Sequence, residues 1–520
     1  MYRCHHDLAT LARALGACAV LLPLVHACRE ADRPTTPSPD LRRPRAPVQT
    51  GLPDRDRPAP GPVAPGAPAV QTAAPPIGSL PEALVGQWSS VFPAPIVQLH
   101  LHLLPNGTVL SWGQAGVPQV WDPATGTFTA VPSPSWLFCA GHDFLPDGRL
   151  LVTGGHIAAG LGLPNTNLFD AGTGSWQPGA AMAQGRWYPT TTTLPSGEVV
   201  TISGTDESGT YVTIPEVGDG TTWHKLTTAD LALPYYPRTF VAPDGRVFYA
   251  GEWQQTYYLD VTGSGTWSNG PLRMFGMRDY GSAVMYEPGK ILYVGGGDPP
   301  TNTAEIIDLN QANPAWTYTG PMAFPRRQLN ATVLPTGDVL VTGGTSTGGF
   351  NNPLGAVHAA ELWSPATGTW TLMASNTVVR IYHSTSLLLP DGRVLHTGSG
   401  DAAGAVDELT YELYSPPYLF QGARPSVTGV TPDVVGYGQT LLVGTPDAAS
   451  IAKVTFIRLG SVTHAFDQAT RLVPLSFSQA AGGLSVTLPA SRTTAPPGPY
   501  MLFLVNAVGA PSVARIMKLQ

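Results

Sequence analysis

The chain has 520 residues, of which only 12% are charged, and its 28 basic and 35 acidic residues give a net charge of −7. The charged fraction is about half of the ~25% that globular proteins usually carry, and without a basic surplus the composition excludes a nucleic-acid-binding footprint. The hydrophobic content of 43% excludes disorder of the whole chain, while 58 glycine and 53 proline residues favour a turn-rich β protein.

Residues 1–27 have the pattern of a secretory signal. A basic start precedes apolar residues 14–25, a run shorter than the ~18 residues that a membrane span requires. Cys28 follows directly, as in the signals of bacterial lipoproteins, although His26 fits that pattern poorly. We therefore expect an exported protein that is periplasmic, lipid-anchored at Cys28 or extracellular, with no membrane span.

Residues 28–82 are rich in proline, mixed in charge and short of aromatic residues. Such a segment cannot bury enough apolar surface to offset its ordering entropy. We expect a disordered, partly polyproline tether. Beyond it the chain contains a single cysteine, Cys139, which has no disulfide partner within the folded part. It is either an inert buried thiol or a reactive one.

Seven segments between residues 103 and 398 share one pattern: a turn ending in glycine, a short run of β-forming residues and another glycine, as in LLPNGTVLSWG and FLPDGRLLVTGG. This pattern is typical of a β-hairpin. The turns recur every 41 to 55 residues, which matches the kelch repeat period of about 50. The turn glycines are Gly107, Gly148, Gly197, Gly245, Gly289, Gly337 and Gly392.

A second turn, closed by an aromatic residue, follows most of these hairpins, as in VWDPATGTF and LWSPATGTW. The two elements together predict a four-stranded blade, and seven copies predict an all-β fold with a seven-bladed kelch-type β-propeller over residues 83–420. The segment GQWSSV (86–91) would close the ring. Short alternating β runs over residues 421–520 predict a small immunoglobulin-like β-sandwich of the early-set type.

Three residues from different blades stand seven residues before a turn proline, namely Cys139, Tyr188 and His383, and Tyr382 directly precedes the last of them. Because inner strands line the axis of a propeller, these side chains can converge at one mouth of the central channel. The triplet RWY or the pair YH alone is typical of blade packing. The shared register is what favours a site.

One cysteine, two tyrosines and one histidine form an unusual donor set for a metal. Zinc prefers tetrahedral Cys/His sites, tetragonal N,O surroundings favour Cu(II), and ferric iron also accepts tyrosinate. One more nitrogen would complete such a site, although the pair His100-x-His102 merely alternates along a strand. The histidines that the propeller offers are His100, His102, His142, His156, His358 and His396.

Four segments strongly resemble the galactose oxidase and glyoxal oxidase family of copper radical oxidases: WLFCAGHDFLPDGRLLVTGG, GRWYPTTTTLPSGEVVTISG, VVRIYHSTSLLLPDGRVLHTG and IRLGSVTHAFDQATRLVPLSF. The ending PPGPYMLFLVNAVGAPSVARI resembles the C-terminal domain of the same family. The resemblance covers residues 83–520 and includes the motifs of the metal site in order.

This resemblance implies one copper ion, with Tyr188, Tyr382, His383 and His464 as its ligands and Tyr382 in the axial position. It also implies a thioether cross-link between Cys139 and Tyr188, and a tyrosyl radical on that cross-linked ring. Tyr188, Cys139 and Tyr382 would be the catalytic residues. His464 would reach the propeller channel on a hairpin of the C-terminal domain.

Two departures from the family pattern affect what the resemblance implies. Galactose oxidases have a tryptophan eighteen residues after the cross-linked tyrosine, stacked on the thioether, where this chain has Asp206. The indole must then come from elsewhere, or the radical is less shielded. No arginine matches the family's sugar-binding arginine, which puts galactose in doubt. The N-terminal carbohydrate-binding module of some members is replaced by the tether.

We expect an exported, monomeric copper radical oxidase that converts a primary alcohol or an aldehyde, of a small molecule or a carbohydrate, with O2 to the aldehyde or acid and H2O2. The alternative is a non-catalytic kelch propeller that binds carbohydrate or protein and retains ligand residues by descent; Asp206 favours it. A hydrolase has little support, because no Ser/His/Asp or paired-carboxylate arrangement stands out.

Overall fold

The computed structural model describes residues 80–402, 405–430 and 432–520. The predicted signal at 1–27, with Cys28 after it, and most of the predicted tether lie outside the described residues. Among the described residues no helix has both the length and the apolar character needed to cross a membrane.

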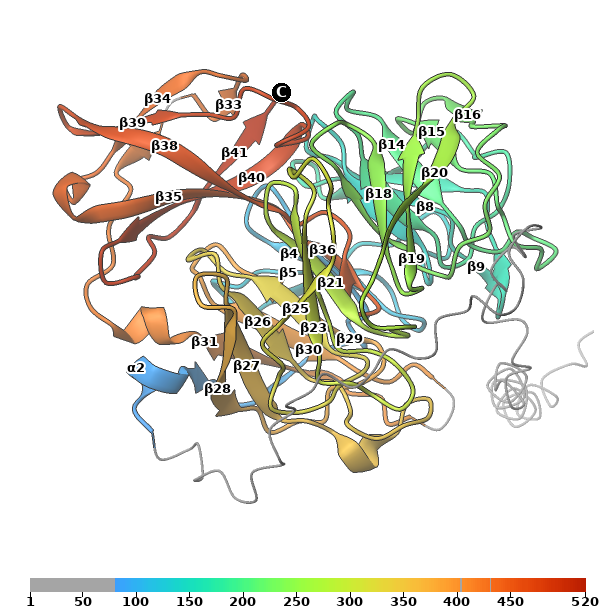
Figure 1. Cartoon of the computed structure of the whole chain (residues 1–520), viewed down its shortest axis with the longest axis horizontal. Helices are drawn as coiled ribbons and strands as arrows, with labels where there is room; N and C mark the ends of the chain where they lie inside the picture. The colour runs from blue at the N-terminus through green and yellow to red at the C-terminus, as the bar shows by residue number, and fades with distance from the viewer. Residues whose placement is uncertain (1–79, 403–404, 431) are drawn as a thin grey trace, which may run out of the picture.

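Seven antiparallel sheets in the described part of the chain form the blades of a propeller (Figure 1), which confirms the predicted fold class. Each blade starts with its innermost strand, and the first β-turn described above joins that strand to the next. A small hairpin, β9 (His156–Ala158) and β10 (Leu161–Gly162), is inserted in blade 2.

The blade strands, in chain order, are β3 (His100–Leu103), β4 (Val109–Trp112), β5 (Gln119–Trp121) and β6 (Phe128–Ala130) in blade 1; β7 (Gly141–Phe144), β8 (Leu150–Thr153), β11 (Thr166–Asp170) and β12 (Ser175–Pro178) in blade 2; β13 (Thr190–Thr193), β14 (Val199–Ile202), β15 (Glu216–Gly218) and β16 (Trp223–Lys225) in blade 3; β17 (Arg238–Val241), β18 (Val247–Gly251), β19 (Gln255–Asp260) and β20 (Thr266–Leu272) in blade 4; β21 (Ser282–Glu287), β22 (Lys290–Val294), β23 (Ala304–Asp308) and β24 (Thr317–Thr319) in blade 5; β25 (Asn330–Val333), β26 (Val339–Thr342), β27 (Ala359–Ser364) and β28 (Thr369–Ser375) in blade 6; and β29 (Ser384–Leu388), β30 (Val394–Gly398) and β31 (Thr410–Ser415) in blade 7.

Blade 7 is completed from the other end of the chain. Strand β1 (Gln87–Trp88) pairs with β31, so that Trp88 lies opposite Tyr414, and β2 (Phe92–Pro93) pairs further along the same strand. The helix α2 (Glu82–Val85) precedes them. The prediction that GQWSSV closes the ring is confirmed. Closure of this kind leaves only short, protected strand edges.

The C-terminal strands form a sandwich around a core of their own, which includes Val443, Phe456 and Leu502. Figure 1 shows it in orange and red beside the blades, with β36 reaching in among them. The strands are β32 (Gly429–Val430), β33 (Val434–Val435), β34 (Thr440–Gly444), β35 (Ile451–Arg458), β38 (Leu472–Ala480), β39 (Gly483–Thr487), β40 (Gly498–Asn506) and β41 (Arg515–Leu519), and the 3-10 turns of the structure are η3 (Pro353–Gly355), η4 (Pro417–Phe420) and η5 (Ala448–Ser450).

One hairpin leaves the sandwich and enters the propeller. It consists of β36 (Ser461–Thr463) and β37 (Phe466–Asp467). Strand β36 pairs antiparallel with β3, the innermost strand of blade 1, and places Val462 opposite Leu101. Both are buried. Strand β36 therefore forms an additional inner strand of blade 1.

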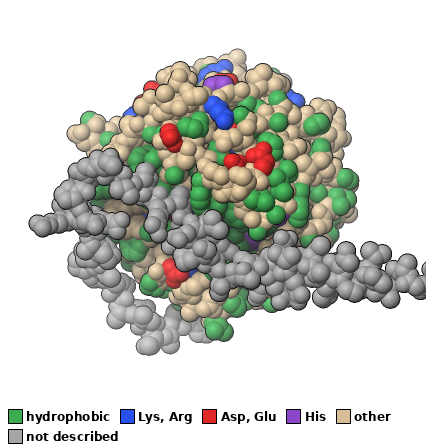
Figure 2. Space-filling view, turned by 90° about the vertical axis from the view of Figure 1, so that its right-hand side faces the viewer, with side chains coloured by type: hydrophobic (Ala, Val, Ile, Leu, Met, Phe, Trp, Pro, Cys, Tyr) green, Lys and Arg blue, Asp and Glu red, His purple; other side chains and the backbone are tan. Residues whose placement is uncertain are grey.

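The outside of the molecule reflects the low charge content. Figure 2 shows one side of it, where hydrophobic and uncharged side chains surround a few separate charged ones. Many of the charged residues that are present lie inside. Within the described residues, four arginine–glutamate ion pairs are buried, and each arginine stands four residues before the innermost strand of its blade. The pairs are Arg186–Glu216 at 3.1 Å, Arg278–Glu305 at 2.6 Å, Arg326–Glu361 at 2.8 Å and Arg380–Glu412 at 3.7 Å.

Arg326→Met is expected to lower the free energy of unfolding by about 3–5 kcal/mol, because it leaves the buried Glu361 carboxylate without its partner. The Arg326 guanidinium also donates to the carbonyl oxygens of Gly343 and Ala359. Urea unfolding followed by tryptophan fluorescence measures the change. Arg515→Gln is the control, since the Arg515–Asp433 pair is exposed and should contribute at most about 1 kcal/mol. Equal losses in the two variants would contradict this account.

Candidate metal centre

Six blades place a residue other than glycine in the left-handed backbone region just before the innermost strand. This conformation is uncommon for such residues and costs free energy, and it clusters at functional sites. Each of the six stands nine residues before the turn glycine of its blade. They are Cys139 (φ 63°), Tyr188 (φ 65°), Tyr236 (φ 46°), Tyr280 (φ 54°), Gln328 (φ 60°) and His383 (φ 68°).

Main-chain hydrogen bonds join these positions from blade to blade. The Tyr188 N–H donates to the Cys139 carbonyl at 2.8 Å, and the Tyr236 N–H donates to the Tyr188 carbonyl at 2.9 Å. The Gln328 N–H donates in the same way to the carbonyl of Tyr280 at 2.9 Å. The six positions form a rim at one mouth of the channel, and these hydrogen bonds join it in two runs, from Cys139 to Tyr236 and from Tyr280 to Gln328.

The four residues predicted as ligands lie together at this rim. The hydroxyl oxygens of Tyr188 and Tyr382 are 2.9 Å apart. The ring of His464 lies 4.6 Å, between centroids, from both Tyr188 and His383, while Tyr382 and His383 stack at 3.8 Å. All four side chains are buried. The hairpin of β36 and β37 thus brings His464 among the propeller residues.

The two histidines have the hydrogen-bonding pattern of metal ligands. Nδ1 of His383 donates to the Gly400 carbonyl at 2.7 Å, and Nδ1 of His464 is bonded to the Thr463 hydroxyl at 2.6 Å. Nε2 of each ring is buried without a hydrogen-bond partner. Since ligating histidines usually engage their other nitrogen in this way, the residues present fit a metal with two imidazole nitrogens.

The remaining donors must be phenol oxygens. No group of three or more His, Cys, Asp or Glu side chains in the described ranges is arranged to hold a metal, so a metal at this rim depends on Tyr188 and Tyr382. Two nitrogens and two phenol oxygens form the N,O donor set that suits Cu(II). The donor chemistry fits copper better than it fits zinc, which prefers Cys and His.

Burial keeps the donor groups uncharged in the protein alone. Burial lowers the pKa of His383 to about 3, and burial together with the nearby His383 holds the pKa of His464 well below its usual value. Burial also raises the pKa of Tyr188 and of the Cys139 thiol well above their ordinary values. The imidazoles therefore retain their lone pairs at neutral pH, whereas the Tyr188 phenol keeps its proton until a cation displaces it.

Cys139 lies next to Tyr188, as the spacing of the turns predicts. Cys139 is fully buried in a packed cluster that contains Tyr188, with Trp187 against it. It is a free thiol. The structure therefore brings together the two residues of the predicted cross-link. Formation of that bond is a proposal, developed below.

Trp187 provides an indole that the sequence did not assign. Its ring stacks on that of Tyr188, with centroids 3.9 Å apart and planes 5° from parallel, and its N–H donates to Nδ1 of His156 at 3.0 Å. Asp206 instead closes a local turn, in which its carboxylate accepts the N–H groups of Ser208 and Thr210. The residue that directly precedes the tyrosine thus covers it.

Three further residues of the rim were not singled out from the sequence, although their spacing from the turn glycine is the same. Tyr236 stacks on His464 at 4.5 Å and its hydroxyl donates to the Ala140 carbonyl. Tyr280 lies 5.6 Å from the Tyr382 ring. Gln328 is buried, and neither its amide oxygen nor its amide nitrogen has a partner. Phe350 packs on Tyr382 at 4.5 Å from a neighbouring loop.

Most of the other propeller histidines are engaged elsewhere. His100 accepts the Cys139 N–H at its Nε2 and is bonded to His142 at its Nδ1, so it has no free nitrogen for a metal. His102 is bonded to Ser461. His396 lies within β30, bonded to the Ser386 hydroxyl, and His358 lies just before β27. His100 and His102 do not join the four candidate ligands.

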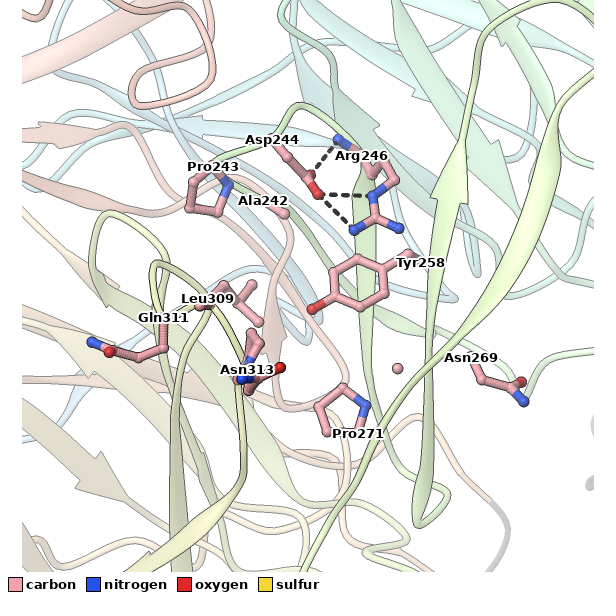
Figure 3. A pocket seen from close by; sticks show the side chains of 13 residues that line it. Ala242, Pro243, Asp244, Arg246, Tyr258, Asn269, Pro271, Leu309, Gln311 and Asn313 are labelled. Carbon is pink, nitrogen blue, oxygen red and sulfur yellow. Dashed lines mark hydrogen bonds and ion pairs between the residues drawn. The ribbon is translucent and has the colours of Figure 1, made fainter.

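A hollow in the surface lies away from this site. It has a volume of about 440 Å³ and lies at the turn of blade 4. Figure 3 shows Arg246 between Asp244, to which it is ion-paired at 2.6 Å, and the ring of Tyr258, 4.1 Å from its guanidinium carbon. This turn follows β17, whereas Tyr236 precedes it. The hollow is therefore at the other end of the inner strand from the candidate centre.

Comparisons with known proteins show what the chain is similar to. Residues 424–519 match the family model described as "Galactose oxidase-like, Early set domain", and residues 297–418 match "Glyoxal oxidase N-terminus". A galactose oxidase of Gibberella zeae is 30% identical over 491 residues, which cover 84% of this chain and 71% of the relative.

A plant relative and a solved structure extend the comparison. An aldehyde oxidase GLOX of Vitis pseudoreticulata is 30% identical over 433 residues, covering 74% of this chain and 82% of that protein. A solved structure described as a novel fungal alcohol oxidase of the AA5 family in complex with copper superimposes with a TM-score of 0.77. It is 27% identical, and the match covers 84% of this chain and all of the other.

Proposed function

The chain belongs to the galactose oxidase and glyoxal oxidase family of copper radical oxidases, and on this premise we propose that it oxidises a primary alcohol or an aldehyde with O2. The products would be the aldehyde or acid and H2O2. The observation that carries the proposal is the convergence of Tyr188, Tyr382, His383 and His464, with two imidazole nitrogens left for a metal.

Copper bound at this centre would supply Lewis acidity and one of the two one-electron acceptors that a two-electron oxidation requires. Tyr188 would be the other acceptor, because its ring can lose an electron, and a sulfur substituent from Cys139 would make that loss easier. Trp187 shields this ring from water on one face. Tyr382 would take the hydroxyl proton of the substrate, since its hydroxyl oxygen lies beside that of Tyr188.

The rim gives some guidance about the substrate. Phe350 and Tyr280 pack against Tyr382. Arg327, the arginine beside Tyr280, is buried and held by Asp279 and Asp298. A guanidinium engaged in this way is less available to a sugar hydroxyl. We therefore propose small alcohols or aldehydes ahead of galactose.

Peroxide release tests the proposal. Copper-loaded protein is assayed by a peroxidase-coupled dye against a panel of primary alcohols, aldehydes and hexoses, with Tyr382→Phe as the control. We expect peroxide from at least one alcohol or aldehyde and a large loss in the variant. Absence of peroxide from the whole panel, in protein that carries copper, would favour the non-catalytic kelch alternative. The feature in favour of that alternative is Asp206, which stands where the family has a tryptophan. Trp187 supplies the stacked indole instead.

Trp187→Phe is expected to shorten the lifetime of the oxidised form of Tyr188 several-fold. The smaller ring covers less of the phenol and loses the hydrogen bond to His156. Decay of the radical signal in electron paramagnetic resonance, without substrate, measures the effect. Trp370→Phe is the control, because that indole donates to Gly320 on the outside of blade 6. An unchanged lifetime in Trp187→Phe would show that the stacking has no protective effect.

Export, the division of the chain and the monomeric state also remain proposals. Intact mass of protein recovered from the exported fraction would show whether cleavage precedes Cys28 and whether that cysteine carries lipid. Limited proteolysis would test the tether at 28–82 and the boundary between 83–420 and 421–520. Light scattering would give the oligomeric state.

A further inference from the structure

The C-terminal hairpin contacts the candidate centre at more than His464. Gln468 follows β37 and is buried. Its side-chain oxygen accepts two main-chain N–H groups, that of His142 at 3.2 Å and that of Thr191 at 3.0 Å. Because both partners are donors, the atom that faces them must be the oxygen of the amide.

The two strands held by Gln468 are those that carry the predicted cross-link. His142 stands three residues after Cys139 at the start of β7, and Thr191 stands three residues after Tyr188 at the start of β13. These strands belong to neighbouring blades, and the bridge joins them at equivalent positions. A single oxygen atom thus fixes the height of one strand relative to the other.

A second connection reaches the Cys139 backbone through side chains. Because the Cys139 N–H donates to Nε2 of His100 at 3.2 Å, the proton of His100 is on Nδ1 and is donated to Nε2 of His142 at 3.0 Å. His142 then carries its proton on Nδ1, which lies 2.7 Å from the hydroxyl of Ser461. The path ends in β36, on the same hairpin as Gln468.

We propose that Gln468 and Ser461 make the C-terminal hairpin a template that positions Cys139 and Tyr188 for formation of the thioether. The inference rests on the proposed function, and it assigns to the hairpin a role separate from ligation by His464. Left-handed backbone at both residues costs free energy. The hydrogen bonds from the hairpin keep the thiol beside the phenol ring despite that cost.

The reaction that the template serves balances with O2 as the oxidant. The S–H bond of Cys139 and one ring C–H bond of Tyr188 break, and one C–S bond forms. Two protons and two electrons leave the protein and reduce O2 to H2O2, with copper bound at the centre. The protein loses two hydrogens, which makes the yield measurable by mass without reference to turnover.

The experiment compares Gln468→Met with Gln468→Glu. Methionine has a similar length but offers no strong acceptor, whereas glutamate keeps an oxygen at the same place; the amide nitrogen of Gln468 has no partner to lose. Copper and O2 are added to copper-free protein, and the loss of two hydrogens is followed by intact mass. Gln468→Met leaves the N–H groups of His142 and Thr191 without their acceptor. We expect cross-linking to slow roughly tenfold or more, since one unsatisfied buried donor would already cause about that much, and Gln468→Glu to recover much of the rate.

Gln439→Met is the matched control, because Gln439 accepts the N–H of Gly436 within the sandwich. Copper affinity, measured by competition with a chelator, should stay within a few-fold in all variants. If Gln468→Met does not fold, Ser461→Ala gives the same comparison with a smaller change. Wild-type cross-linking rates in the folded variant would overturn the template. Failure of the unaltered protein to cross-link would instead count against the proposed cofactor itself.

Discussion

Cys139→Ser is expected to abolish the loss of two hydrogens on treatment with copper and O2, together with most of the oxidase activity. Serine occupies nearly the same space beside Tyr188 but cannot form the thioether. Without the sulfur substituent the phenol ring is harder to oxidise, so the second one-electron acceptor is lost. Intact mass and peroxide release, measured on the same preparation, should change together.

The same substitution has a consequence for stability. The bond between Cys139 and Tyr188 would close a loop of about 50 residues, and if it acts on the unfolded chain as a disulfide does, it would stabilise the protein by about 4 kcal/mol. Urea unfolding before and after treatment with copper and O2 should show this gain in the wild type only. Active, copper-loaded enzyme in which Cys139 still reacts with an alkylating reagent would rule out the cross-link.

His464→Ala is expected to weaken copper binding by about a hundredfold or more, since it removes a direct ligand, and loss of a residue that merely supports a ligand already costs 10–100-fold. Its Nε2 is buried without a hydrogen-bond partner. His464 has a left-handed backbone, and the strain of alanine at this position is small compared with the loss of a ligand. Competition with a chelator measures the affinity, and circular dichroism verifies the fold.

His396→Ala is the control for this experiment, because His396 is equally buried but lies within β30, hydrogen-bonded to Ser386. It should lower stability while copper affinity stays close to that of the wild type. A folded His464→Ala variant that binds copper as the wild type does would remove His464 from the ligand set. Truncation after Tyr418 removes His464 together with the whole C-terminal sandwich, and it should also abolish copper-dependent activity.

The fold could be predicted because its signals are local and repeated. A turn glycine and a run of β-forming residues mark each blade in the sequence. The strand that closes the ring contains an aromatic residue, Trp88. The same register brought Cys139, Tyr188 and His383 to one rim. Tyr236, Tyr280 and Gln328 share that register and could have been found by extending the alignment to every blade.

Other parts of the centre have no signal of this kind. No spacing rule relates His464 to the propeller, so only the family resemblance pointed to it. Trp187 departs from the family pattern, because here the residue adjacent to the tyrosine, and not the one eighteen positions later, stacks on the ring. The hydrogen bonds of Gln468 to two neighbouring blades depend on how the hairpin packs in three dimensions, which periodicity does not encode.

The pairing of β36 with β3 also determines what separation of the two regions would do. A propeller without the hairpin would expose the unpaired inner edge of β3, and an isolated sandwich would present a strand with nothing to pair with. The propeller would then be an acceptor sheet and β36 a donor strand, as in complexes formed by strand addition. The two regions produced as separate polypeptides should therefore recognise each other, and the metal site would be assembled from both only after they combine.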